Sequence, residues 1–82
     1  MEAQIGTITH YYNRINVAVV QLSGRLAVGD RIIIMGHTTD IEQFVTSMEV
    51  EHEKIMAAEA GAEIAIWVEG PVRRGDILIK PV

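Results

Sequence analysis

Apolar and polar residues alternate in short, evenly spaced runs along the chain, and a period of two is typical of β-strands. In the clearest run, residues 44–53, the even-numbered positions, among them Met48 and Val50, would face one way and three glutamates the other. This pattern predicts an antiparallel strand with one buried and one charged face. The whole pattern predicts six strands, over residues 4–12, 15–22, 31–36, 44–53, 62–69 and 77–80.

Glycines separate the predicted strands and favour tight turns. Gly29, between Val28 and Asp30, supplies a backbone that tolerates positive φ, and Gly6 indicates a bend or a close backbone approach. The stretch 54–60 holds good helix formers, but seven residues are too few for propensity alone to decide, so we predict a loop with at most one helical turn.

Six strands joined by glycine turns, without the spacing of βαβ units, predict an all-β domain over residues 1–82. We expect a six-stranded antiparallel closed barrel, since closure removes the exposed strand edges that favour aggregation. The middle of the second strand, Val17–Val20, should be buried on both sides. The predicted core comprises Ile8, Val17, Val19, Ile32, Ile34, Met48, Val50, Ile64, Ile66 and Leu78.

Composition narrows the class of protein. The 82 residues are 49% hydrophobic and 22% charged, which favours one small folded domain over disorder. The absence of cysteine excludes disulfides and thiolate chemistry and fits a cytoplasmic location. Because no apolar run exceeds five residues, we expect no segment that spans a membrane.

The net charge of −4 is unevenly distributed. Residues 1–40 sum to zero, residues 41–69 carry −6, and residues 70–82 carry +2. Nucleic-acid binding by phosphate neutralisation needs a broad basic face, which this chain lacks. Any RNA contact would therefore be local, on the arginine-bearing side of the domain.

Three motifs occur in a fixed order: Val-Gly-Asp within 24–30, Ala-Gly within 59–66, and Arg-Gly-Asp followed by Lys-Pro within 73–81. This order resembles the second domain of translational GTPases such as elongation factor Tu, a six-stranded antiparallel Greek-key barrel. A closer likeness is to stand-alone elongation-factor-like barrels and to the C-terminal barrel of collagenase-like peptidases. Both carry a stretch similar to 36–40, then a Gln and a Ser-Met, here Gln43 and Ser47-Met48.

The resemblance implies a binding module without enzymatic activity that contacts tRNA, the ribosome or a translation-related partner. No Gly-rich phosphate loop is present in the sequence, so no nucleotide or other cofactor is expected. The alternative is a detached accessory subunit of a collagenase-like peptidase or of an RNA-modifying enzyme, which would act through protein–protein contacts.

The candidate partner-binding residues lie in predicted turns. Arginines in turns could meet phosphate or an acidic partner, and the 37–40 hairpin loop could offer hydroxyl and imidazole groups. Ordinary solvated turn charges and a loop whose side chains satisfy its own amides remain the alternatives. The candidates are Arg14, His37, Thr38, Thr39, Arg73 and Arg74.

Other chemistry is weakly supported. The three histidines, at positions 10, 37 and 52, fall on different elements, so no metal site is predicted. Neither serine has the context of an activated nucleophile, and strand glutamates exposed to solvent are poor acid–base pairs. Of the adjacent Tyr11 and Tyr12, one should enter the core and one should lie outside, while Trp67 is interpreted as core or barrel-mouth filler.

Overall fold

The computed structural model describes residues 2–81, and these form strands joined by turns and bends, with no helix among them. The all-β prediction is therefore confirmed. No helix in this described range has the length and apolarity needed to cross a membrane. The strands are β1 (Glu2–Tyr12), β2 (Val17–Leu22), β3 (Leu26–Ala27), β4 (Arg31–Met35), β5 (Asp40–Phe44), β6 (Met48–Val50), β7 (Glu53–Ile55), β8 (Ala57–Ala58), β9 (Glu63–Trp67) and β10 (Ile77–Pro81).

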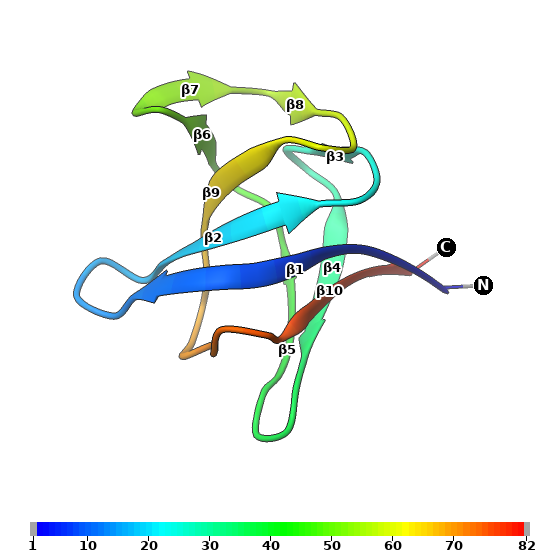
Figure 1. The fold of residues 1–82 in the computed structure, drawn as a ribbon, viewed down its shortest axis with the longest axis vertical. Helices are drawn as coiled ribbons and strands as arrows, with labels where there is room; N and C mark the ends of the chain where they lie inside the picture. Colours follow the sequence, from blue (N-terminus) through cyan, green and yellow to red (C-terminus); the bar gives the residue numbers. More distant parts are fainter. Residues whose placement is uncertain (1, 82) are drawn as a thin grey trace.

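Eight of these strands form one antiparallel sheet in the order β5-β4-β10-β1-β2-β9-β6-β7, and β3 pairs with β8 in a small second sheet. The long strand β1 lies in the middle of the large sheet and pairs with both β10 and β2 (Figure 1). Its register with β10 shifts between Gln4 and Gly6. A Cβ on Gly6 would lie 2.6 Å from Val20 Cγ1, so the predicted bend and close approach are both present.

The predicted closed six-stranded barrel is wrong. The large sheet is open, because its outermost strands β5 and β7 do not pair with each other within residues 2–81. A side chain crosses from β5 instead: buried Gln43 donates Nε2 to the Trp67 carbonyl at 2.9 Å and accepts from the Glu69 amide at 2.8 Å. The side-chain amide of Gln43 thus hydrogen-bonds one backbone carbonyl and one backbone N–H group, as the backbone of a neighbouring strand would.

The predicted strand 44–53 is also wrong, because the chain bends within it. Phe44 ends β5 and is 59% exposed, whereas Val45 is buried, so the predicted alternation reverses there. Residues 48–50 form β6, and a two-residue turn then leads directly into β7. Residues 54–60, predicted as a loop, instead supply most of β7 and all of β8.

Three turns share one design. In each turn of four residues, the third residue is glycine, and the backbone N–H of the fourth residue donates to the carbonyl of the first. The three turns are residues 27–30, 59–62 and 73–76. The glycines Gly29, Gly61 and Gly75 have φ of 96°, 95° and 95°, as the third residue of a type II turn requires. Asp30 and Asp76 close their turns by accepting a hydrogen bond from the turn's first amide. The prediction for Gly29 is thus confirmed.

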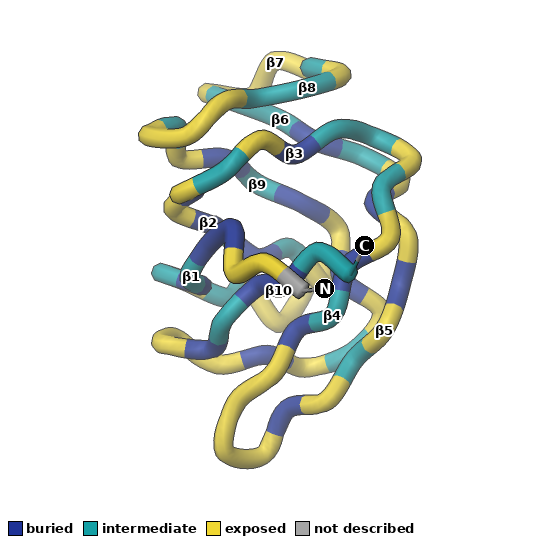
Figure 2. The backbone as a smooth tube through the Cα atoms, turned by 90° about the vertical axis from the view of Figure 1, so that its right-hand side faces the viewer, coloured by how far each residue is buried: buried dark blue, intermediate teal, exposed yellow. Residues whose placement is uncertain are grey.

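The core lies inside the curled sheet, and buried positions alternate with exposed ones along the strands (Figure 2). Most of the predicted core is confirmed, but Val17 and Val19 are only half-buried, because β2 points Ala18, Val20 and Leu22 inward instead. Val50 packs at the edge of the core. Confirmed core residues are Ile8, Ile32, Ile34, Met48, Ile64, Ile66 and Leu78.

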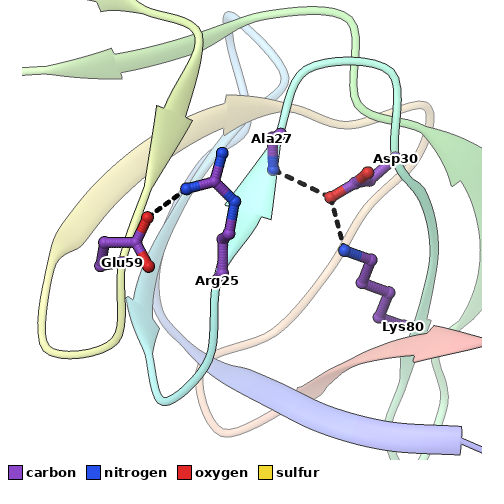
Figure 3. A network of polar contacts seen from close by, with 5 residues as sticks. All are labelled: Arg25, Ala27, Asp30, Glu59 and Lys80. Atoms are coloured by element: carbon purple, nitrogen blue, oxygen red, sulfur yellow. Dashed lines mark hydrogen bonds and ion pairs between the residues drawn. The ribbon is translucent and has the colours of Figure 1, made fainter.

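Polar contacts tie the first glycine turn to the rest of the domain (Figure 3). Asp30 accepts from the Ala27 amide at 2.9 Å and from Lys80 Nζ at 3.0 Å, which joins the turn to β10. Nearby, Arg25 forms an ion pair with Glu59, so the turns 27–30 and 59–62 lie close together. Desolvation of the Asp30 carboxyl raises its pKa, but the hydrogen bonds from Lys80 and Ala27 and the nearby positive charges outweigh this, and the pKa lies below its ordinary 3.8.

The lowered pKa predicts a pH dependence of stability. Because Asp30 has a lower pKa in the folded chain than in the unfolded chain, its ionised carboxylate contributes fully to the free energy of unfolding above pH about 4. The contribution is lost as pH falls from there through the folded-state pKa. When the pH is lowered from 6 to 3, the free energy of unfolding should fall less for Asp30→Asn than for the natural chain. Urea titrations at each pH measure this fall. The exposed Asp40→Asn variant is the control, and equal losses in Asp30→Asn and the natural chain would contradict the prediction.

Candidate docking surfaces

Five of the six predicted site residues lie on two neighbouring loops at one end of β4 and β10. An ideal Cβ on Gly36 would lie 1.8 Å from Asp76 Oδ1, so the 36–39 loop touches the 73–76 turn. His37 and Thr38 are exposed there, as are Arg73 and Arg74. Thr39 is only 5% exposed, so its hydroxyl is not at the surface for a partner. The loop end therefore presents two arginines beside a histidine and a threonine.

The sixth residue, Arg14, lies elsewhere. It is in the hairpin between β1 and β2, which projects from a different side of the domain than the loop after β4 (Figure 1). The structure therefore does not gather the six predicted residues into one site. Among residues 2–81, no three side chains of the His, Asp and Glu types gather to hold a metal ion.

The two adjacent tyrosines separate as predicted. Tyr11 packs against the core and its hydroxyl donates to Asn16 Oδ1 at 3.1 Å, while Tyr12 is 49% exposed. The Tyr12 ring stacks edge-on against His10, with centroids 4.3 Å apart. Of the two placements expected for Trp67, core or barrel mouth, the core placement is wrong: Trp67 is 39% exposed and lies opposite Val17 in the β2–β9 ladder.

The outward face of β2 and β9 forms an apolar groove that the sequence did not predict. Its floor holds Val17, Val19 and Ala65, which point away from the core because their neighbours Ala18 and Ile64 point inward. The β1–β2 hairpin flanks the floor on one side, and the β6–β7 hairpin flanks it on the other (Figure 1). We call this the β2–β9 groove. It encloses about 730 Å³ and is lined by Tyr12, Ile15, Val17, Val19, Glu49, Val50, Glu51, His52, Ala62, Glu63, Ile64 and Ala65.

The charge in this groove has one sign. Glu49, Glu51 and Glu63 line it, while no lysine or arginine does. Lys54 lies opposite Glu49 in the β6–β7 ladder but is not among the lining residues. The groove thus combines an apolar floor with an acidic rim.

The wall formed by the β6–β7 hairpin has an unusual turn. Val50 pairs with Glu53, which leaves Glu51 and His52 as the two turn residues. Both have positive φ, 50° and 68°. A two-residue hairpin turn of this kind normally carries Asn-Gly, because side chains are disfavoured in the left-handed region. The turn therefore holds a groove glutamate at some cost in backbone energy.

No protein-family model matches the chain. Among curated proteins, the chain is 34% identical over 74 residues to an uncharacterized protease of Methanocaldococcus jannaschii, covering 89% of this chain and 18% of that protein. It is 36% identical over 78 residues to a collagenase of Porphyromonas gingivalis, covering 93% of this chain and 22% of that protein. The chain spans about a fifth of the length of the curated relatives it matches.

Solved structures agree on the fold. Two crystal structures of the C-terminal domain of a Geobacillus thermoleovorans protein assigned as a U32 peptidase superpose with TM-scores of 0.88 and 0.90. Their sequence identities are 17% and 18%, each covers 96% of this chain, and the chain covers 99% and 92% of them.

These comparisons correct the functional prediction. The relatives are a protease and a collagenase, so the expected translation-factor-like module contacting tRNA or the ribosome is wrong. The collagenase-like part of the resemblance is supported instead. The residues behind the translation-factor likeness lie mainly in the three glycine turns, which fix the geometry of the turns. The chain is thus similar in sequence to one part of larger collagenase-like proteases and similar in fold to the C-terminal domain of a U32 peptidase.

Proposed function

We propose that this chain is a non-catalytic accessory module of a collagenase-like peptidase and that it acts through protein–protein contacts. The observation that carries the proposal is the extent of the sequence match. Nearly the whole chain aligns with about a fifth of two larger proteolytic relatives. A domain that recurs as one part of such proteins is suited to bind the rest of the enzyme or its substrate.

The surface of the domain supports a docking role. Tyr12, Ile15 and Trp67 are 49%, 61% and 39% exposed on the face that bears the β2–β9 groove. Apolar patches rimmed by polar groups mark interaction sites more often than random surface does. We place the peptidase chemistry in the four-fifths of the relatives that this chain does not match.

The loop end is a second, polar contact surface in this proposal. Arg73 and Arg74 are exposed beside His37 and Thr38, and the glycine turn that carries them is fixed by Asp76. Arginine pairs well with carboxylates of a partner. Arg14, on its separate hairpin, would belong to the groove side of the domain.

The test uses the purified chain and a purified collagenase-like peptidase of the same organism, deleted for the part that corresponds to this chain. We expect the chain alone not to cleave gelatin, and we expect it to bind the truncated peptidase in calorimetric titrations. Gelatin cleavage that rises with the concentration of the chain alone would overturn the non-catalytic role. Absence of a complex at 100 µM would overturn the accessory role.

A further inference from the structure

The β2–β9 groove has the chemistry to select its occupant. Its floor is built from the small branched and methyl side chains of Val17, Val19 and Ala65, and its hairpin wall adds the exposed Ile15. Such a floor accepts apolar side chains and offers few hydrogen-bonding groups. At about 730 Å³ it has the volume of a pocket for a drug-sized ligand, which is enough for a short stretch of a protein chain.

We propose that the β2–β9 groove binds a segment of the partner protein in which one or two large apolar side chains are flanked by lysine or arginine. This inference rests on the proposed docking role and names the partner chemistry. The apolar side chains cover the floor, and the basic side chains meet the glutamates of the rim.

Charge complementarity carries the choice of a basic segment. Three glutamates and one histidine line the groove and no lysine or arginine does, so an approaching acidic segment or a phosphate would be repelled by the glutamates. The stretch 41–69, which includes the β6–β7 wall, carries a net charge of −6, although Glu42 and Glu59 in it lie outside the groove and pair with Arg31 and Arg25. Opposite charges at a rim act mainly on association rate and partner choice, while apolar burial supplies most of the affinity.

A second copy of this chain is the competing occupant. The hairpin between β1 and β2 carries Arg14 beside the exposed Ile15, which is itself a basic and apolar pair. Two copies would, however, each bring a net charge of −4 to the contact. Light scattering after size-exclusion chromatography measures the molar mass and tests this alternative. A dimer that dissociates in the Ile15→Ser variant would show that the groove joins two copies and would overturn the proposal.

The chain carries its own reporter for binding. Trp67 is the single tryptophan and lies next to the floor, opposite Val17. Its fluorescence can be titrated with three heptapeptides that lack tryptophan. One alternates lysine with leucine, one alternates glutamate with leucine, and one alternates lysine with serine. We expect the Lys-Leu peptide to bind at least tenfold more tightly than either other peptide, and we expect its affinity to fall with added salt.

Matched variants locate the site. Glu49→Gln plus Glu63→Gln should lower the affinity for the Lys-Leu peptide about tenfold, at roughly 0.7 kcal/mol of binding free energy for each removed charge. The control, Glu42→Gln plus Glu59→Gln, removes the same charge from residues outside the groove and should leave the affinity within twofold. Equal binding of the Glu-Leu peptide, or equal weakening by both double variants, would overturn the proposal.

The same variants keep this inference separate from the accessory role. The truncated peptidase should bind the control variant normally and the groove variant about tenfold more weakly. If it binds both double variants as tightly as the natural chain, the groove assignment is wrong while the accessory role stands. If it binds none of the three but the Lys-Leu peptide still depends on Glu49 and Glu63, the groove stands and the accessory role fails.

Discussion

Gln43→Leu should lower the free energy of unfolding by about 3 kcal/mol. The leucine has a similar size but leaves the Trp67 carbonyl and the Glu69 amide without the partner that Gln43 now provides. Both hydrogen bonds are part-buried, and a backbone group that loses its partner away from water costs about 1–3 kcal/mol. For a domain of this size the loss corresponds to a fall in Tm of about 15 °C. Urea and thermal unfolding followed by far-UV circular dichroism measure both quantities.

Gln21→Leu is the matched control for this prediction. Gln21 also donates its amide to a backbone carbonyl, that of Gly61 at 3.1 Å, but the contact is exposed to solvent. Water can replace the lost bond there, so we expect a change below about 0.5 kcal/mol. If both variants lost the same stability, the Gln43 hydrogen bonds to Trp67 and Glu69 would not be a main support of the fold.

Gly36→Ala should destabilise the domain by about 3 kcal/mol through a steric clash. The added Cβ would lie 1.8 Å from Asp76 Oδ1 and 2.5 Å from its Cγ, far inside contact distance. Asp76 has little room to move, because it is 5% exposed and accepts a 2.8 Å hydrogen bond from the Arg73 amide. Relief therefore requires either a shift of the 36–39 loop or loss of that bond.

Gly70→Ala provides the comparison for Gly36→Ala. Its Cβ would approach only the end of the Ile41 side chain, at 3.4 Å, and the backbone of Gly70 does not have positive φ. We expect its unfolding free energy to stay within about 1 kcal/mol of the natural value. A Gly36→Ala variant as stable as Gly70→Ala would show that the two loops are not held against each other.

Alternation along the chain was sufficient to predict most of the strands. The predicted strands at 4–12, 15–22, 31–36, 62–69 and 77–80 correspond to β1, β2, β4, β9 and β10. The run 44–53 failed because alternation cannot reveal a bend: Val45 is buried although Phe44 should have been. In the run Val17–Val20 all four residues are apolar, so periodicity could not tell which side faces the core.

The groove could not have been predicted from local pattern. Its lining comes from β2, β9 and the turn after β6, which are far apart in sequence and meet only through sheet topology. One signal in the sequence was available: β2 has more apolar residues than a strand with one buried face needs, because Val17 and Val19 are apolar although they lie on the outward face. The motifs that did stand out, such as Arg73–Asp76, specify turn geometry and so indicate a fold more strongly than a function.

The turn at Glu51 and His52 makes the groove wall a place where thermostability can be engineered. Two side chains with positive φ, 50° and 68°, cost roughly 2–4 kcal/mol in total at about 1–2 kcal/mol for each residue. The natural sequence is therefore not the most stable one for this hairpin. An Asn-Gly turn would relieve the backbone, but it would also remove one of the three acidic side chains of the groove. Heat resistance and partner selectivity thus compete for the same two positions.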